Sequence, residues 1–331
     1  MDINLDKWYR CTVDKNEFSK LCHKSNWSGF KHTTIFFGSL FFFGYLAFIT
    51  WGTWWSVLFF LIYGNIYACS DSMWHETSHR TAFKSKFWND FFYQISSYMN
   101  NFEPVRWRYS HFKHHSFTAF NDPFDFEIVI RKPVDLFYFF SFFIPFFQNI
   151  FFIHKSLQVE TLKHALGFTT DVMAQCIPEE KRSKCRNSAR IHVAIWIGAI
   201  ILSIIFKSWF PVLYIVLPGI YGATLNKLFG LTQHTGLEVN IKDHRYSSRT
   251  VYINPIFSFL YWHMEYHIEH HMFPTVPSYN LKKLHNLIKE QLPPPKKGLW
   301  DAYKEIILTL IKQAKNPNYK IKINVPNPQL K

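Results

Sequence analysis

The chain has 331 residues, of which 20% are aromatic, 36 of them Phe, and only 18% are charged. Such a composition suits a chain embedded in lipid better than one surrounded by water. The formal net charge of +14 is compatible with a nucleic-acid-binding surface or with excess Lys and Arg on the cytoplasmic side of a membrane protein. The apolar segments described next favour the membrane protein, so no nucleic-acid partner is expected.

The N-terminal segment, residues 1–32, is polar and basic and shows no signal peptide, so we expect it in the cytosol. The chain has an odd number of cysteines and no C-x-x-C pair. This pattern argues against a disulfide framework and against a thiolate zinc site.

Four apolar segments approach the roughly 20 residues that a membrane-spanning helix needs. They are residues 33–50, 53–73, 189–206 and 209–230. They predict an all-α, multi-pass membrane protein with four transmembrane helices in two hairpins. Pro218 and Gly219 are expected to kink the last helix, which a packed helix tolerates. The alternative is a set of buried helices in a soluble protein, and the long, uncharged segments disfavour it.

Residues 134–153 are also apolar but contain Pro145, Gln148 and Asn149. A full crossing here would place the histidine groups described below on opposite faces of the membrane. We therefore predict that this segment lies in the interface or is re-entrant. Segments 154–190 and 273–331 are rich in Lys and Arg, which places them in the cytosol and the hairpin tips outside.

The chain is thus expected to divide into a cytosolic N-terminal segment (1–32), a membrane domain (33–280) and a cytosolic C-terminal tail (281–331). The tail contains an amphipathic helix, because apolar residues follow helical spacing from Leu299 to Ile311. Its predicted role is a lid or packing element, and a partner surface is the alternative.

Histidines in the stretch "HETSH" suggest a metal site. On a helix, His75 and His79 lie one turn apart and can bind zinc, with Glu76 as the general base of a metalloprotease. Three further histidine groups must be explained by the same hypothesis.

The second group is "HFKHH", with His111, His114 and His115, on a helix expected to begin near Pro104. The third is "HIEHH", with His267, His270 and His271, and His234 stands alone at the end of the last apolar segment. Residues i, i+3 and i+4 share one helical face, so each H-x-x-H-H group directs three imidazoles toward one place.

Nine imidazoles exceed the three or four ligands of one zinc ion. Divided between two metals they give four or five each, and imidazole suits iron, copper and zinc alike. The protease hypothesis leaves seven of the clustered histidines without a role, whereas a dinuclear centre uses all nine.

Polar residues beside the histidines are candidates for orienting the ligands, with ordinary solvated charge as the alternative for the carboxylates. These candidates are Glu76, Asp122, Asp125, Glu265, Glu269 and His263. His263 lies one turn before His267 and is an alternative ligand. Arg80 and Arg245 are expected to pair with nearby acids rather than with an anionic substrate.

The order H-x-x-x-H, H-x-x-H-H, H-x-x-H-H, with hairpins between, resembles the integral-membrane fatty acid desaturase and hydroxylase superfamily over roughly residues 35–315. The stretch "DHRYSSRTVYINPIFSFLYWHMEYHIEHHMFPTVP" (243–277) is especially similar to a bacterial branch that includes hydrocarbon-oxygenase-like enzymes of rhizopine catabolism.

The resemblance implies two iron ions (Fe2+/Fe3+) on the cytosolic side, with O2 as co-substrate. The residues that match the family's ligands are His75, His79, His111, His114, His115, His234, His267, His270 and His271. Some members have an Asn one turn before the lone histidine. Gly230 stands there in this chain, and Asn226, a further turn back, is not assigned.

The predicted function is therefore an O2-dependent di-iron membrane oxidoreductase that acts as a desaturase on a fatty acyl or lipid-like substrate, with no catalytic residue beyond the metal ligands. A hydroxylase or monooxygenase acting on a hydrocarbon or small molecule is the alternative within the family. A zinc metalloprotease is a more distant alternative. A non-enzymatic haem or metal carrier is a third possibility, but scattered single histidines would suffice for it, and the two H-x-x-H-H groups therefore disfavour it.

Electrons must come from a partner, because the sequence has no G-x-G-x-x-G motif and no cysteine cluster. The resemblance implies a ferredoxin with its reductase or a cytochrome b5-type donor, which a basic cytosolic face would attract. The expected location is the bacterial inner membrane, with the active site on the cytosolic side.

Overall fold

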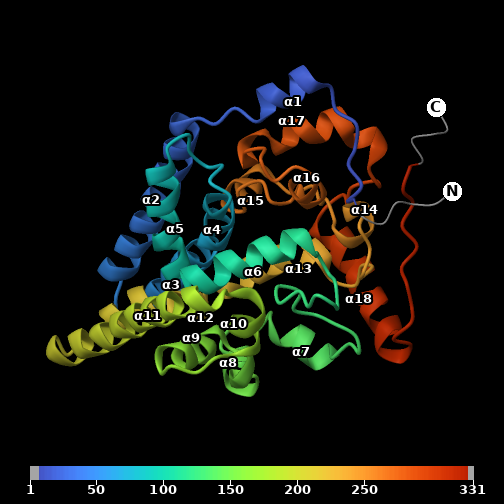
Figure 1. Cartoon of the computed structure of the whole chain (residues 1–331). Coiled ribbons are helices and arrows are strands. Elements are labelled where there is room, and N and C mark those ends of the chain that lie inside the picture. The colour runs from blue at the N-terminus through green and yellow to red at the C-terminus, as the bar shows by residue number, and fades with distance from the viewer. Residues whose placement is uncertain (1–6, 327–331) are drawn as a thin grey trace. The chain divides into compact units, whose positions relative to one another are not determined.

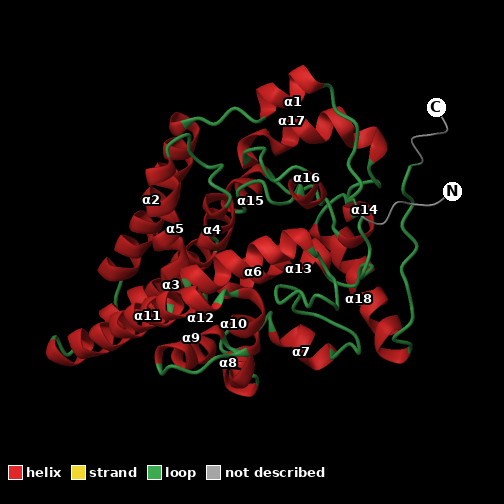
Figure 2. Cartoon of the chain, in the orientation of Figure 1, coloured by secondary structure: helices red, strands yellow, loops and turns green. Residues whose placement is uncertain are grey.

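The computed structural model describes residues 7–326, and this part of the chain is helical with connecting loops (Figure 2). Within these residues no β-strand forms, and the only sheet-like pairings are isolated bridges from Thr250 to Tyr266 and from Val251 to Lys296. The predicted all-α class is confirmed.

The chain divides into two compact units, each assembled from segments far apart in sequence. We call residues 1–25, 111–139 and 229–331 the histidine-rich unit, and residues 26–110 and 140–228 the apolar unit. The linear division at residues 32 and 280 stays a prediction.

The apolar unit contains the longest helices of the described chain (Figure 1). Its helices are α2 (Asn26–Ile49), α3 (Trp54–Ala68), α4 (Ser70–Ser78), α5 (Lys86–Met99), α8 (Phe147–Phe151), η1 (Ile153–Lys155), α9 (Leu157–Ala165), α10 (Asp171–Cys176), α11 (Glu179–Ile205), η2 (Val212–Val216) and α12 (Pro218–Tyr221). Three more helices begin or end in it: α6 (Pro104–Ser116), α7 (Leu136–Ser141) and α13 (Ala223–His234).

Among the described residues, α2 and α11 are the two helices long and apolar enough to cross a membrane. They contain the first and third predicted spans. The second predicted span is divided at Cys69 between α3 and α4, and the fourth is divided among η2, α12 and α13. A topology with four spans therefore stays a prediction.

The break in the fourth segment has an identifiable cause. Pro218 has no backbone N–H, so carbonyl groups one turn before it lose their helical partner. Hydroxyl groups of α3 replace that partner. Tyr63 donates to the carbonyl of Tyr214 at 3.1 Å, and Tyr67 donates to that of Ile215 at 3.3 Å.

Two glycines allow α3 and α12 to pack backbone against backbone. A Cβ atom added to Gly64 would lie 2.2 Å from the Tyr221 ring, and one added to Gly222 would lie 1.8 Å from the carbonyl carbon of Gly64. No side chain fits at either position, so this helix crossing depends on glycine.

The ambiguous segment 134–153 forms only short helices. α7 ends at Ser141 and α8 begins at Phe147, and Phe146 between them has a φ of 64°. Its placement at the interface stays a prediction.

The histidine-rich unit is built from short helices joined by ordered loops. They are α1 (Lys15–Leu21), α14 (His244–Ser247), α15 (Pro255–Leu260), α16 (His267–Met272), α17 (Ser278–Ile288), η3 (Lys289–Gln291) and α18 (Leu299–Lys315), together with the last part of α6 and of α13. The predicted tail helix corresponds to α18, whose Ala302, Ile306 and Leu310 are fully buried.

Candidate metal centre

Helix α6 carries the second histidine group. It begins at Pro104, as predicted, and the carboxylate of Glu103 accepts the backbone N–H groups of Val105 at 3.0 Å and Arg106 at 2.6 Å. An acidic cap of this kind satisfies donors that have no partner inside the helix. The opposite end of the same helix presents His111, His114 and His115.

Helix α16 carries the third group and is only six residues long. His267, His270 and His271 are 1%, 0% and 4% exposed. The chain enters this helix through Trp262 and His263, whose φ angles of 52° and 56° are left-handed. A hydrogen bond of 3.0 Å from the Val251 N–H to the Glu265 carbonyl holds this entry in place.

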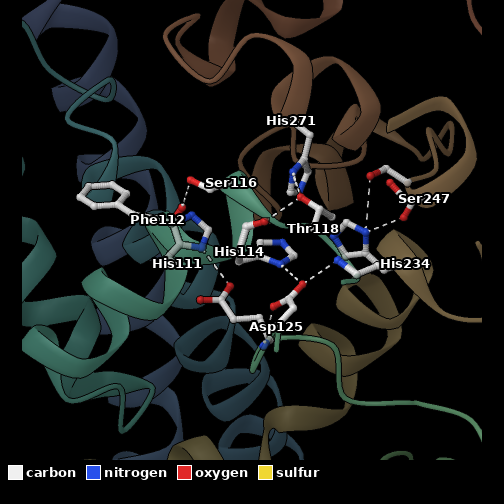
Figure 3. A network of polar contacts seen from close by, with 12 residues as sticks. His111, Phe112, His114, Ser116, Thr118, Asp125, His234, Ser247 and His271 are labelled. Atoms are coloured by element: carbon white, nitrogen blue, oxygen red, sulfur yellow. Dashed lines mark hydrogen bonds and ion pairs between the residues drawn. The ribbon is translucent and has the colours of Figure 1, made fainter. Parts of the chain in front are cut away.

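Four imidazoles of the histidine-rich unit converge on one point. Ligand atoms of His114, His234, His267 and His271 all lie within 4.8 Å of one another. His267 Nε2 lies 2.9 Å from His234 Nε2 and 3.0 Å from His271 Nε2. The lone His234, which ends α13, is thus brought to the histidines of α6 and α16 (Figure 3).

Partners on the outer nitrogen of three of these rings identify their tautomers. His234 Nδ1 lies 2.7 Å from the Ser247 carbonyl, which can only accept, and His114 Nδ1 lies 2.8 Å from Asp125 (Figure 3). His271 Nδ1 lies 3.2 Å from the Thr118 hydroxyl, which already donates to the His114 carbonyl at 2.7 Å. Each Nδ1 therefore carries hydrogen, and each Nε2 presents a lone pair.

This arrangement suits a cation. Lone pairs of His234 and His271 both face His267 Nε2, which has at most one hydrogen to offer them. A metal ion among the four rings would satisfy every inward-facing nitrogen at once. Carboxylate and carbonyl partners on the outer nitrogen are the usual support of metal-binding histidines. The donor set therefore fits a metal that accepts imidazole ligands.

Burial keeps the imidazoles in the state that binds metal. Loss of hydration lowers the pKa of His234 and of His270 to about 3, and it lowers the pKa of His267 and His271 well below its usual range. Near neutral pH these rings are uncharged, with a lone pair available.

Asp125 and His114 form a coupled pair. Burial opposes ionisation of Asp125, but His114 and the backbone N–H groups of Ala119 and Glu127 hold its pKa well below the usual range. Burial likewise lowers the pKa of His114, and Asp125 more than offsets that effect, so the pKa is raised.

A second group in the same unit contains His111, His115 and His270, whose ligand atoms also lie within 4.8 Å of one another. His111 Nδ1 contacts the carboxylate of Glu127 at 2.9 Å. In the apolar unit, α4 carries His75 and ends before His79, and the centroids of these two rings are 5.5 Å apart. Glu76 between them is fully buried.

The remaining polar candidates lie in different surroundings. Glu269 bonds to His285 and, at 2.7 Å, to the Thr250 hydroxyl. Glu265 and His263 both bond to the Ser258 hydroxyl. Asp122 is exposed.

Both arginines pair with acids, as predicted. Arg80 donates to Asp90 at 3.0 and 3.1 Å, and Arg245 donates to Asp243 at 2.7 to 3.1 Å.

Sequence reasoning missed the partners of the histidines. Thr118 and Glu127 lie in turns and Ser247 ends the short helix α14, and no motif marks any of them. His244 was also missed, although it is 2% exposed and its ring centroid lies 4.9 Å from that of His271. Its place in "DHR", 27 residues before His271, gave no spacing signal.

These observations define an all-helical protein with clustered imidazoles suited to metal binding and with two helices that fit membrane association. The sequence profile of the family described as "Fatty acid desaturase" matches residues 49–303. This is well over half of the chain, and the chain therefore belongs to the fatty acid desaturase family. Among curated proteins, none matches the chain. The family supports an oxidoreductase rather than a protease.

Proposed function

We propose that the protein is an O2-dependent membrane oxidoreductase that binds two iron ions and introduces a double bond into a fatty acyl or lipid-like chain. The observation that carries the proposal is the convergence of His114, His234, His267 and His271, with hydrogen held on the outer nitrogen of three rings. Bound iron would supply oxygen activation and the removal of hydrogen from an unactivated C–H bond.

We assign one iron to these four histidines. The second iron is assigned to His111, His115 and His270, whose ligand atoms lie within 4.8 Å of one another. His75 and His79 stay ligands predicted from the sequence alone. Gly230 offers no side chain where some family members place an Asn, and a Cβ atom added there would meet nothing within 4 Å. The first iron is therefore proposed to have only imidazole ligands from the protein.

The protein's own contribution is to orient the ligands and exclude water. Asp125, Glu127 and the Ser247 carbonyl fix the rings of His114, His111 and His234. On α16, Ile268 and Met272 are 1% and 2% exposed, so the apolar residues of this helix are shielded from water together with its histidines. The orienting roles predicted for Glu76, Asp122, His263, Glu265 and Glu269 stay predictions.

The finer features of this function rest on the sequence. We propose a multi-pass location in a bacterial inner membrane with the site on the cytosolic side, within the branch that includes the rhizopine-type enzymes. Electrons are proposed to come from a ferredoxin and its reductase or from a cytochrome b5-type donor. Hydroxylation is the alternative outcome, because the same histidines serve both reactions.

Product analysis tests the proposal. The full-length protein, purified in mild detergent with iron, is supplied with reduced ferredoxin, labelled oxygen and a panel of fatty acyl substrates. A desaturase gives a product lighter by two hydrogen atoms and without the label, whereas a hydroxylase gives a product that carries it. Hydrolysis of a peptide bond, abolished by Glu76→Gln and retained in His114→Ala, would contradict both.

A further inference from the structure

Residues 8–25, here called the strap, cross the histidine-rich unit and lie outside the part of the chain that matches the family. In Figure 1 the strap runs from α1, beside α17, toward α14. Hydrogen bonds join the strap to other residues of the histidine-rich unit along its length. The Tyr9 N–H donates to the Lys242 carbonyl at 2.9 Å, and Thr12 and Gln291 exchange two hydrogen bonds of 2.8 Å. Near its end, Asn280 donates to the Leu21 carbonyl at 2.9 Å.

Trp8, at the start of the strap, lies beside the four-imidazole group. Its indole stacks on His244 with ring centroids 4.1 Å apart and an angle of 5° between the planes. Its Nε1 donates to the carbonyl of Ser116 at 3.1 Å. Ser116 ends α6, directly after His115, and the His244 ring also lies next to that of His271, with centroids 4.9 Å apart. The Trp8 indole thus contacts both the end of α6 and the His244 ring beside His271.

His244 depends on this stack for its position. The ring is buried, and its Nδ1 has no hydrogen-bond partner among the described residues. A buried polar atom without a partner disfavours the position it occupies, so van der Waals contact must retain the ring. Trp8 supplies that contact on one face of the ring, and the His271 ring is a second neighbour.

We propose that Trp8 is a positioning residue that closes the outer side of the metal centre. By holding His244 against His271 and by fixing the end of α6, it keeps the ligands converged and slows escape of the bound metal. The inference rests on the proposed function only for the identity of the metal, because the same stack would retain any cation held by these imidazoles.

The rate of metal loss tests this role. Full-length protein loaded with iron is mixed with excess EDTA, and the iron left on the protein is measured over time. Trp8→Ala should lose iron roughly three to ten times faster than the wild type, the range expected from one aromatic stack. Trp8→Phe, which keeps a ring but loses the N–H, should lie between them. Trp300→Ala is the matched control, because Trp300 is 85% exposed in the same unit.

Equal rates in Trp8→Ala, Trp300→Ala and the wild type would overturn the proposal. The unfolding temperature of each metal-free variant is measured as well. If the variants lose iron faster only in proportion to a lower unfolding temperature, the proposal is also overturned. If Trp8→Ala does not fold, Trp8→Phe is compared with the wild type instead. Iron loss from Trp8→Phe at the wild-type rate would then contradict the proposal. Repeating the assay with Co2+ separates the two hypotheses. A Trp8-dependent rate with Co2+ in a protein that binds no iron would support the strap and reject the iron enzyme.

Discussion

At the residue scale, spacing in the sequence identified the histidines but not their partners. H-x-x-H-H is a local pattern, so a helix places its three rings on one face wherever that helix lies. Thr118 and Glu127 lie in turns and Ser247 ends the four-residue helix α14, and the position of these segments beside the rings depends on the whole fold. Asp122 and Asp125 were equal candidates in the sequence, yet only Asp125 is buried beside His114.

Asp125→Asn tests the support of His114. Asn has no negative charge and only one acceptor oxygen, whereas both oxygens of Asp125 accept hydrogen bonds, so the support of the His114 Nδ1–H is weakened. Changes to such outer partners typically cost about 10- to 100-fold in metal affinity. We expect that loss in a metal titration of the purified protein. Asp122→Asn, at an exposed position three residues earlier, should bind like the wild type. Equal affinity in both variants would show that Asp125 does not support the ligand.

The buried imidazoles predict how stability depends on pH. His234 and His270 have a folded-state pKa of about 3, below the ordinary value of 6.5. As pH falls below 6.5, the unfolded chain binds protons that the folded chain does not. Each group then removes about 1.4 kcal/mol of stability per pH unit.

The unfolding midpoint of the metal-free protein should therefore be flat above pH 7 and fall steadily toward pH 5. The variant with both His234→Gln and His270→Gln should show a shallower fall, because two of the responsible groups are gone. A midpoint that rises as the pH drops through 6 would contradict this account.

At the element scale, local sequence determines where some helices begin, whereas tertiary contacts determine where others are interrupted. Pro104 and Glu103 define the start of α6 locally, and the sequence predicted it. The fourth apolar segment was expected as one kinked helix, and it forms η2, α12 and α13 instead. The interrupted form is stabilised by tyrosine hydroxyls of α3, more than 140 residues away in the chain. No local pattern reveals such partners.

A pair of glycine variants tests the packing of α3 on α12. Gly64→Ala places a methyl group against the Tyr221 ring and should cost about 1–3 kcal/mol through overpacking. Gly230→Ala, also within a helix, meets nothing and should be neutral or stabilise by up to about 1 kcal/mol. Thermal unfolding in detergent distinguishes them. A similar effect in both variants would show that the crossing does not need glycine.

At the scale of the whole molecule, composition and the histidine groups were enough to predict an all-α protein with a histidine-rich metal site, and the resemblance to the fatty acid desaturase superfamily supplied the expected chemistry. The assembly of the histidine-rich unit from three distant segments was not predictable, because the contacts that create it are long-range. Nor did the sequence reveal the strap, whose polar residues look like an ordinary solvated terminus until Trp8 is seen on His244.

Metal content tests the central claim most directly. Protein purified in mild detergent from iron-supplied cells is analysed by mass spectrometry for metal per chain. The account predicts nearly two irons in the wild type, and a sharp fall in both His114→Ala and His270→Ala. One zinc per chain, unchanged in those two variants but lost in His75→Ala, would contradict it and make "HETSH" the site of a membrane metalloprotease.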